Sequence, residues 1–344
     1  MIFEYYREHC LRYSNRFFIS EEIMLHTALK LFYCEINSNK YILPYDSSSI
    51  DFSLSIALKK NYSEHLERNL LGIQLIRNKT LNSYELKSGE IHEIKGSEIS
   101  YLSNSIYGYS DTTGTSSGYC NTQIIIEKGV LELVEKNELA LIWYGMLGSG
   151  IRLSTDKYSE YLRYFNDYQS DVVDDIVVLY SQNISNIHVI YVFLFKEKKI
   201  VSSGIAGRLS FNEAFNAAIE EAKLLLIIYQ DIKYGEYASI TKQEHIKVYN
   251  HIKKIENIRT TNYSELNKKN CEQKVINMFS SQLDKFEVVF LNPVNTCQGK
   301  TVKISSSVLY NCIPRRENIK SIKKIFQIYH IDPFKLEIPD CIIV

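Results

Sequence analysis

The stretch GVLELVEKNELALIWYG, residues 129–145, predicts a buried helix that carries two nearby carboxylates. Apolar side chains recur almost all round its helical turns, as they do in helices that lie inside a domain. Glu132 and Glu135 stand three positions apart, so a helix places both carboxylates on one face. Two like charges on such a helix are costly to bury unless a cation bridges them or one carboxylate becomes protonated. The pair therefore points to a bound cation or a perturbed carboxylate.

The bulk composition is that of a globular protein without a preferred charged partner. The 344 residues carry 40 basic and 40 acidic side chains, which gives no support for a nucleic acid or a membrane surface as a partner. Apolar runs such as Val189–Phe195 suit buried strands and are far shorter than the roughly 20 residues of a membrane span. The N-terminus lacks the pattern of a secretion signal, and we expect a cytoplasmic protein.

The cysteines and histidines give no metal-binding or disulfide pattern. The seven cysteines are scattered singly and none stands in a CxxC motif, which is typical of reduced thiols in a cytosol. The eight histidines form neither HExxH nor HxH. We therefore expect no transition metal held by protein ligands.

Helical and strand-like patterns interleave irregularly along the chain, which predicts an α+β (mixed α/β) fold. We expect helices over residues 52–71, 122–144, 153–170 and 211–230, and a helical region over 231–275. Strands are expected at 176–180 and 188–195, with the last strand at 286–293. Residues 1–50 mix both patterns, 72–110 suggest short strands and turns, and 111–118 a small-residue loop. No linker divides the chain, so we predict one domain over 1–344 with 1–50 as an N-terminal extension.

One frame recurs in three of the predicted helices. A small or apolar residue is followed seven positions later by Glu, and usually by a second Glu three positions further on. The members are Ala57 with Glu64 and Glu67, Ile125 with Glu132 and Glu135, and Ala214 with Glu221 and Leu224. The spacing between the copies is too irregular for a solenoid. It is consistent with three helices that converge on one place.

Two interpretations of these carboxylates stay open at this point. Carboxylates are hard oxygen ligands that suit Mg²⁺, which is commonly held by one or two of them together with nucleotide phosphates. Alternatively, each pair lies on a solvated helix face, because Glu64 and Arg68, like Glu132 and Lys136, have the spacing of an ordinary ion pair. The loop before the second helix fits either a phosphate site built from N–H groups or a plain helix cap. Residues 145–150, GMLGSG, lack the Lys-Ser/Thr of a P-loop and are expected to form a turn.

Taken together, these segments resemble the YcaO family. Residues 112–145, TTGTSSGYCNTQIIIEKGVLELVEKNELALIWYG, resemble its central motif, in which an SxGxAxG-like loop leads into a helix of the form GLLExxERDA. Residues 57–69, ALKKNYSEHLERN, resemble its first helix, and residues 202–226, SSGIAGRLSFNEAFNAAIEEAKLLL, resemble its third. The order is that of the family, and the resemblance covers roughly residues 50–340.

The resemblance implies a YcaO-like fold in which helices with ExxE motifs line a nucleotide site, with ATP and Mg²⁺ as cofactors. It assigns no catalytic residue. The cofactor-binding residues that it implies are Glu64, Glu67, Arg68, Glu132, Glu135, Lys136 and Glu221. Within this set, the four implied Mg²⁺ ligands are Glu64, Glu67, Glu132 and Glu135.

The sequence departs from the family pattern in several places. Cys120 and Ile124 stand where the family typically has an Asn and a Glu that help bind nucleotide and metal. Asn121 and Glu127 lie nearby in the sequence. The other departures are Lys60 for Ser, Lys136 for Arg and Leu224 for Gln.

The C-terminal region differs from the family as well. Its only prolines after residue 320 are Pro333 and Pro339, whereas azoline-forming members often end in a PxPxP-like tail. Arg315 and Arg316 are interpreted as a surface basic pair rather than as phosphate contacts.

The activity that the resemblance implies is ATP- and Mg²⁺-dependent cyclodehydration. Such an enzyme forms thiazoline or oxazoline rings from Cys, Ser or Thr of a ribosomally made precursor peptide by phosphorylating the backbone amide oxygen, as in the biosynthesis of bacteriocin or thiopeptide antibiotics. A separate leader-peptide-binding protein, E1-like (ThiF-like) or RRE-containing, is the expected partner in an oligomer or heterocomplex. Alternatives are thioamide or amidine formation, or a catalytically weakened scaffold subunit of a peptide-modifying complex, which the departures motivate.

Overall fold

The computed structural model contains helices and mainly antiparallel strands in mixed order, which confirms the predicted α+β class. The structure describes residues 2–5, 11–19, 22–29, 33–36, 39–42, 46–77, 79–100, 103–105, 108–118, 121–167, 171–231, 237, 240–266, 283, 285–291 and 299–343. The chain divides into two compact units. Unit 1 is Met1–Leu133 with Asp284–Cys312, and unit 2 is Val134–Leu283 with Ile313–Val344. The single YcaO-like domain over 1–344 stays a prediction.

Unit 1 begins with a four-stranded antiparallel sheet in the order β1-β2-β3-β6. Its strands are β1 (Ile2–Tyr5), β2 (Leu11–Ile19), β3 (Glu22–Leu29) and β6 (Asp46–Asp51). A separate hairpin joins β4 (Tyr33–Ile36) to β5 (Asn39–Ile42). All elements that the structure describes within residues 1–50 are therefore strands, so the helical part of the mixed prediction is wrong there.

A second, five-stranded antiparallel sheet of unit 1 has the order β11-β18-β17-β7-β8. Its strands are β7 (Thr80–Glu85), β8 (Ile91–Lys95), β11 (Thr115–Gly118), β17 (Glu287–Phe290) and β18 (Lys300–Ser305). The short elements α2 (Gly96–Ile99), β9 (Ser103–Ser105) and β10 (Gly108–Ser110) complete the unit. Two expectations are corrected here: the second half of the small-residue loop is strand β11, and β18 follows the strand that was expected to be the last.

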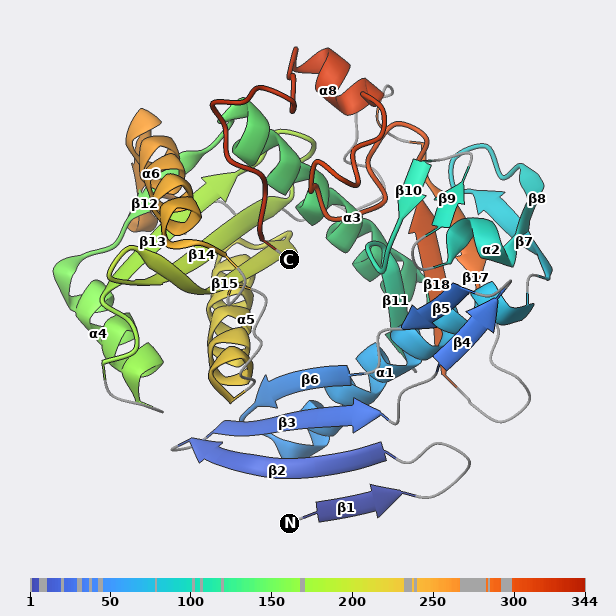
Figure 1. The fold of residues 1–344 in the computed structure, drawn as a ribbon, viewed down its shortest axis with the longest axis horizontal. Coiled ribbons are helices and arrows are strands. Elements are labelled where there is room, and N and C mark those ends of the chain that lie inside the picture. Colours follow the sequence, from blue (N-terminus) through green and yellow to red (C-terminus); the bar gives the residue numbers. More distant parts are fainter. Residues whose placement is uncertain are drawn as a thin grey trace. The chain divides into compact units, whose positions relative to one another are not determined.

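Helix α1 (Leu54–Arg77) contacts both sheets of unit 1 (Figure 1). Its buried face continues through Leu70, Leu71 and Gln74, and Gln74 stands four and three positions after the two leucines. The stretch GIQLIR, residues 72–77, is therefore the end of this helix and not a strand. The alternation within that stretch imitates the period of a strand, but the helical spacing of the buried residues before it extends the helix.

Helix α3 (Thr122–Gly145) matches the prediction of a helix over residues 122–144, and both units share it. Its first half, up to Leu133, belongs to unit 1, and its second half, from Val134, belongs to unit 2. Every residue from Leu133 to Tyr144 is buried, including the polar ones. Because this one helix carries both Glu132 and Glu135, it provides one carboxylate to each unit.

Unit 2 is built on a five-stranded sheet in the order β15-β14-β13-β12-β16, antiparallel except for the β12–β16 pair. Its strands are β12 (Ser149–Arg152), β13 (Asp175–Ser181), β14 (His188–Lys196), β15 (Lys199–Arg208) and β16 (Thr260–Asn262). Strands β13 and β14 were expected, whereas no strand was predicted where β15 lies. Strand β12 begins inside GMLGSG, so only its first part is a turn.

Strand β15 escaped prediction because it is rich in small residues, which are weak strand formers. Those residues let helix α5 (Phe211–Asp231) approach closely. A Cβ atom on Gly204 would lie only 2.5 Å from the backbone nitrogen of Ala222. The composition of β15 therefore serves the packing of α5 rather than strand propensity.

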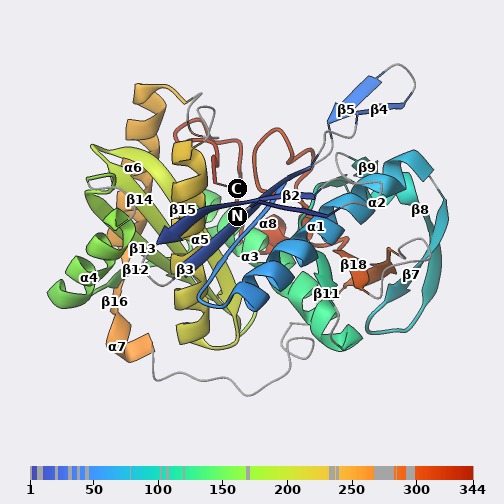
Figure 2. The same ribbon diagram turned by 90° about the horizontal axis from the view of Figure 1, so that it is seen from below.

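Helices cover both faces of the unit 2 sheet (Figure 2). Helix α5 and helix α4 (Thr155–Asn166) pack on one face, where Ile190 and Val192 of β14 lie in the same apolar cluster. On the other face, the ring of Phe195 lies 4.9 Å from that of Tyr249 in helix α6 (Lys242–Ile258). Burial on both faces explains the uninterrupted apolar run of β14. Short helices α7 (Tyr263–Leu266) and α8 (Lys324–Ile328) lie further along the chain.

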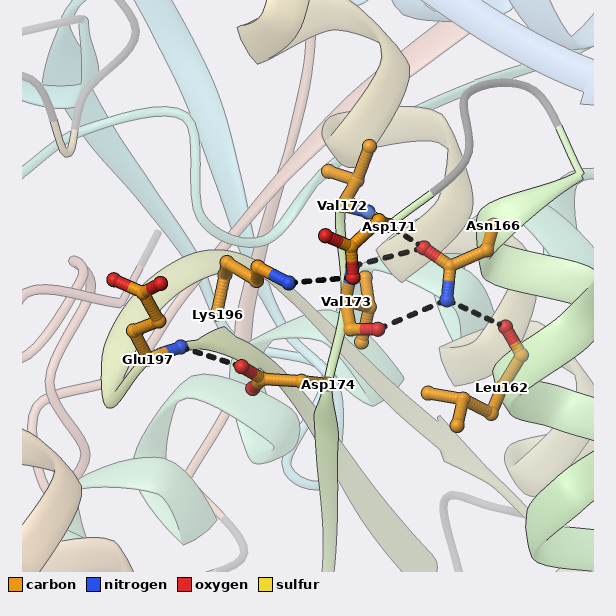
Figure 3. Close-up of polar contacts among 8 residues, drawn as sticks. All are labelled: Leu162, Asn166, Asp171, Val172, Val173, Asp174, Lys196 and Glu197. Atoms are coloured by element: carbon orange, nitrogen blue, oxygen red, sulfur yellow. Dashed lines mark hydrogen bonds and ion pairs between the residues drawn. The ribbon is translucent and has the colours of Figure 1, made fainter.

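Asn166 ends helix α4 four residues earlier than expected (Figure 3). Its side-chain oxygen accepts hydrogen bonds from the N–H groups of Val172 and Val173, and its amide donates to the carbonyl groups of Leu162 and Val173. At the same corner, Lys196 donates to Asp171 at 2.6 Å in an exposed ion pair. These contacts fix the entry into β13 and involve none of the predicted site residues.

The region predicted as helical over 231–275 contains α6, β16 and α7, and residues 267–282 lie outside the described residues. Among the helices in the described part of the chain, none combines the length and the apolar character needed to cross a membrane.

Candidate functional site

The structure gathers the predicted site residues in two acidic clusters, one in each unit. The first cluster, in unit 1, consists of Glu64, Glu67 and Arg68 on α1 and Glu132 on α3. The second cluster, in unit 2, consists of Glu135 and Lys136 on α3 and Glu221 on α5. The shared sequence frame therefore corresponds to two pairwise approaches, α1 to α3 and α5 to α3.

In the first cluster, backbone N–H groups from the small-residue segment hold two carboxylates. The N–H of Ser117 donates to Oε1 of Glu67 at 2.7 Å, and the N–H of Gly114 donates to Oε2 of Glu132 at 3.1 Å. These two N–H groups therefore serve neither as a cap of α3 nor as donors to a phosphate in this state. They orient the two glutamates.

Glu64 forms the ordinary i,i+4 ion pair with Arg68 that its sequence spacing allowed. Its Oε1 lies 2.6 Å from a guanidinium nitrogen of Arg68, and its Oε2 accepts the N–H of Ser48 at 2.7 Å. Both side chains of the ion pair are more than a quarter exposed. The i,i+4 pair is thus formed, and its partly exposed position leaves it accessible to a ligand.

Glu67 is the perturbed acid of the first cluster. Burial raises its pKa well above the usual range, and the neighbouring charges of Glu132 and Glu64 raise it further. The N–H of Ser117 and the charge of Arg68 act in the opposite direction without cancelling this shift. A carboxylate beside other carboxylates favours either a proton or a cation, so the cluster has the electrostatics of a site for a divalent cation.

In the second cluster, the carboxylates receive N–H groups from β15. Gly207 donates to Oε2 of Glu135 at 3.0 Å, and Ile205 donates to Oε2 of Glu221 at 2.8 Å. Because β15 is the last strand in the order of its sheet, alternate N–H groups along it are not used by β14. The edge of the sheet therefore positions both acids.

Lys136 balances the charge of the second cluster. Its Nζ lies 3.3 Å from Oε1 of Glu135, and both side chains are about nine-tenths buried. Burial raises the pKa of Glu221 to about 7, with Lys136 lowering it and Glu135 raising it. Lys136 therefore forms a buried ion pair with the adjacent Glu135, a contact that the i,i+4 spacing from Glu132 did not predict.

Two residues near the first cluster were missed by sequence reasoning. Lys303 on β18 is fully buried, and its Nζ donates to the carbonyl oxygens of Asp111 and Thr113 at 2.7 and 2.5 Å. Ser117 supplies the N–H that holds Glu67. The available signal for Lys303 was a lysine within the strand-like stretch KTVKIS, residues 300–305, for which no strand was predicted.

The departures near the start of α3 leave that helical turn without an inward carboxylate. Ile124 is exposed, and Cys120 lies outside the described residues. Glu127 accepts a hydrogen bond from the side chain of Gln123 at 2.9 Å, and Oδ1 of Asn121 accepts the N–H of Gln123. Asn121 and Glu127 therefore make local helix contacts.

Arg316 is not part of a surface basic pair, which corrects the prediction. Its guanidinium donates to the carbonyl oxygens of Pro333, Lys335 and Ile338 at 2.6–2.8 Å and lies over the ring of Tyr144. These are backbone and ring contacts of the C-terminal segment in unit 2, so Arg316 holds that segment in place.

The residues of the first cluster fit Mg²⁺ bound together with a nucleotide. Within the described residues, no three carboxylate, imidazole or thiol side chains form a group that would hold a metal ion alone. Mg²⁺ in nucleotide-dependent enzymes needs only one or two carboxylates, because phosphate oxygens and waters complete its octahedral shell. Glu67 and Glu132 provide such a pair, and the charge of Glu132 is, after burial, the next cause of the raised pKa of Glu67, a repulsion that a bound cation would relieve.

Comparison with known protein families identifies the family to which the chain belongs. The family model described as YcaO cyclodehydratase, ATP- and Mg²⁺-binding, matches residues 99–277, which is just over half of the sequence. The chain belongs to the YcaO family, and ATP and Mg²⁺ are the cofactors of this family's domain. The matched range contains α3 and α5 and therefore Glu132 and the whole second cluster, whereas α1 precedes it.

Solved structures show the same fold at low sequence identity. YcaO from Methanopyrus kandleri, bound with AMPPCP and Mg²⁺, is similar with a TM-score of 0.65 and 13% identity, over 87% of this chain and 85% of that one. The Escherichia coli microcin synthetase McbBCD complex gives a TM-score of 0.63 and 15% identity, over 97% and 96% of the two chains. A structure of the same complex with pro-MccB17 bound gives 0.63 and 14%, over 89% of each chain. No curated protein matches the chain in sequence. These similarities confirm the YcaO-like fold.

Proposed function

We propose that this protein is an ATP- and Mg²⁺-dependent cyclodehydratase that acts on a ribosomally made precursor peptide. It converts Cys, Ser or Thr residues into thiazoline or oxazoline rings. The observation that carries the proposal is the pair of acidic clusters on consecutive turns of α3, within a chain of the YcaO family. The net-acidic character of the first cluster supports a divalent cation, and buried N–H donors keep its carboxylates in place.

The proposed roles follow from the surroundings of each residue. Glu67 and Glu132 contact Mg²⁺, with Glu64 as the third acid of the first cluster, and Arg68 contacts a phosphate group. Glu135, Lys136 and Glu221 of the second cluster are the remaining residues of the implied cofactor-binding set, and their charges already balance one another in part. When bound, ATP supplies the phosphoryl group that turns an amide oxygen into a leaving group, and Mg²⁺ offsets the charge on it.

The balance of the proposed reaction is simple. The thiol or hydroxyl of the substrate residue attacks the preceding peptide carbonyl carbon, which forms the new C–S or C–O bond. The former amide oxygen leaves with the phosphoryl group as phosphate. The thiol or hydroxyl loses its proton, and the nitrogen loses its proton as it forms the C=N bond of the ring. Each ring therefore lowers the mass of the peptide by about 18 Da, and one ATP is consumed per ring.

A separate protein is proposed to recruit the leader part of the precursor peptide. We infer an E1-like (ThiF-like) or RRE-containing partner in a heterocomplex. A related fold in McbBCD is solved as a complex, including one with pro-MccB17 bound, which supports an assembly of several proteins with a peptide. If the purified chain alone binds the leader peptide tightly, the separate partner is not needed.

The first test measures the binding of AMPPCP by calorimetry with and without Mg²⁺. The double variant Glu132→Gln/Glu135→Gln removes one carboxylate charge from each cluster. Mutation of outer-shell partners of metal ligands already costs about 10–100-fold in affinity, so we expect a loss of at least about 100-fold for the ligands themselves. The matched control is Glu93→Gln/Glu160→Gln, which removes one exposed carboxylate from each unit and should bind like the wild type. Binding that is equal in the two double variants would contradict the assigned roles.

The second test identifies the product by mass, with the precursor peptide, its partner and ATP. Ring formation predicts a loss of about 18 Da per ring, whereas a thioamide made with sulfide adds about 16 Da. An amidine from an internal amine also loses about 18 Da, and it is distinguished by the lysine or N-terminal amine that becomes blocked. Nucleotide binding without any mass change would favour the scaffold subunit, which the exposed Ile124 at a family Glu position motivates.

A further inference from the structure

Lys303 is a fully buried cation beside the first cluster that no proposed cofactor role uses. It stands in the middle of β18, and none of its surface is exposed. A buried ammonium ion is costly unless hydrogen-bonded acceptors surround it. Here its Nζ donates to two backbone carbonyl oxygens, those of Asp111 and Thr113. The carboxylates of Asp111 and Glu132 lie near enough to favour its charged form, although burial lowers its pKa to about 8.

The peptide unit between Thr113 and Gly114 links Lys303 to Glu132. Its carbonyl oxygen accepts from Nζ of Lys303 at 2.5 Å, and its N–H donates to Oε2 of Glu132 at 3.1 Å. The described peptide bonds are trans, so the C=O and N–H of this planar unit point in opposite directions. One peptide unit is therefore held from both sides, by a cation on its carbonyl and by a carboxylate on its amide.

The surrounding backbone leaves this peptide unit little freedom to rotate. Gly114 has a φ of +79°, and its carbonyl oxygen accepts the N–H of Ile304 at 2.7 Å. A Cβ atom on Gly114 would lie 2.6 Å from the carbonyl oxygen of Ile304, and one on Gly129 of α3 would lie 3.0 Å from the carbonyl oxygen of Gly114. Both positions therefore need glycine for the strand, the turn and the helix to approach this closely. Because the C=O of Thr113 and the N–H of Gly114 belong to one planar unit, the donor that fixes the carbonyl also fixes the direction of the N–H.

We propose that Lys303 is a positioning residue for Glu132, acting through the Thr113–Gly114 peptide unit. Its ammonium group fixes and polarises the carbonyl, and the opposite N–H of the same unit then holds the Glu132 carboxylate in one orientation. The functional consequence rests on the proposed role of Glu132 as a Mg²⁺ contact. Without Lys303, the turn would keep a buried carbonyl without its donor and would reorient to satisfy it, which releases Glu132.

The sequence offers a direct probe of this single peptide unit, because it contains only one Thr-Gly dipeptide. Labelling with [¹³C-carbonyl]threonine and [¹⁵N]glycine in a cell-free system makes Thr113–Gly114 the one unit visible in a carbonyl–nitrogen correlation spectrum. In Lys303→Met we expect both resonances to move and the Gly114 amide to exchange with solvent roughly fivefold faster or more. In Glu132→Gln the amide resonance should move in the same experiment, which reports the other side of the unit.

The matched control is Lys223→Met. Lys223, on α5 in unit 2, is also almost fully buried, and its Nζ lies 3.5 Å from the centre of the Tyr164 ring. Both variants lose a buried ammonium ion, but only the change at Lys303 should alter the labelled unit. If Lys303→Met does not fold, Lys303→Gln serves instead, because it removes the charge with a smaller change in polarity. Unchanged resonances and exchange in a folded Lys303 variant would overturn the proposal.

A binding cycle tests the functional consequence. We expect Lys303→Met to weaken Mg²⁺-dependent AMPPCP binding about tenfold in the wild-type background, as expected for the loss of a residue that orients a metal ligand. In the Glu132→Gln background the same change should weaken binding by about twofold or less, because the orientation of a missing carboxylate cannot matter. Equal effects in both backgrounds would overturn this consequence. If no protein binds the nucleotide, the proposed function fails, while the spectra still decide the role of Lys303.

Discussion

Glu132 and Glu135 lie one turn apart on α3, yet the charges around them differ. Around the first cluster, the interacting charges are the carboxylates of Glu64, Glu67, Asp111 and Glu132 and the cations Arg68 and Lys303. Around the second cluster, they are the carboxylates Glu135 and Glu221 and the cations Lys136 and Arg208. Among these groups, the first cluster is net acidic and the second is balanced.

This difference indicates different tasks for two similar ExxE positions. The balanced second cluster is an ion pair inside unit 2 and stabilises the approach of α5 and β15 to α3 without further charge. The first cluster keeps a perturbed acid, Glu67, whose charge a divalent cation would compensate. Removing the cation from the second cluster should therefore destabilise unit 2. Removing a carboxylate charge from the first cluster should instead stabilise unit 1 when no Mg²⁺ is present. The predictions below test this contrast.

The largest effect is expected for Lys136→Met in the second cluster. The substitution leaves Glu135 buried beside Glu221 without the cation at 3.3 Å. Breaking a buried ion pair by removing one partner typically costs a few kcal/mol, and we expect the free energy of unfolding to fall by about 3 kcal/mol. Urea denaturation in buffer without Mg²⁺ measures this loss.

Lys136→Arg is the control for that experiment, because it keeps the positive charge that the family has at this position. We expect it to retain most of the unfolding free energy. A smaller loss is expected because the larger, forked guanidinium group of Arg must repack in the space of the Lys ammonium group. A loss below about 1 kcal/mol for Lys136→Met would mean that the second cluster is not held together by its ion pair.

The pH dependence of stability gives the next effect, through Glu221. Its folded-state pKa, about 7, lies above the ordinary value of 4.5, so the folded state retains a proton that the unfolded state loses. The stability from this group is therefore complete below pH 4.5 and is lost as the pH rises to about 7. Between pH 5 and 7, we expect the free energy of unfolding to fall by about 2 kcal/mol from this group.

Glu221→Gln isolates this contribution from the other acids. Gln can still accept the N–H of Ile205 through its side-chain oxygen and has no charge to titrate. The difference in unfolding free energy between wild type and variant should therefore change across pH 5–7 and stay constant above about 7.5. A difference that is flat from pH 5 to 7 would contradict the raised pKa of Glu221.

The sequence predicted the elements whose hydrophobic period is strong. Helix α3 and strand β14 were located almost to the residue because their apolar residues form long buried patterns. Strand β15 was missed because Gly204 and its small neighbours serve the close approach of α5, which is visible only in three dimensions. The end of α1 was predicted as short strands because, over only six residues, an alternating pattern of apolar side chains fits a strand as well as the last turns of a helix.

The acidic residues of the candidate site were predictable from the sequence, but their ion-pair and hydrogen-bond partners were not. The recurring frame indicated Glu67, Glu132, Glu135 and Glu221, since the helical period places them on inward faces. The pairing of Lys136 with the adjacent Glu135, and the hold of Lys303 on a turn nearly 200 residues earlier, depend on tertiary packing. No local pattern encodes a contact between a strand near the C-terminus and a turn before α3.

The smallest expected effect has the opposite sign and concerns Glu67→Gln in the first cluster. The Gln side-chain oxygen can keep the hydrogen bond from Ser117, while the charge that burial and Glu132 oppose is removed. In buffer without Mg²⁺ and nucleotide, we expect the free energy of unfolding at pH 7.5 to rise by about 1 kcal/mol. The same variant should lose Mg²⁺-dependent AMPPCP binding, because a positive charge is then no longer required at this position.

Glu93→Gln on the exposed strand β8 is the matched control in unit 1, and it should change neither the unfolding free energy nor the binding. A stability gain together with a binding loss is what a site built around a missing cation predicts, since the repulsion between the carboxylates is what the cation relieves. If Glu67→Gln instead destabilises the protein as much as Lys136→Met does, then the two clusters are electrostatically alike. In that case the acids of both clusters would be structural, and the assignment of Mg²⁺ to the first cluster would have to be given up.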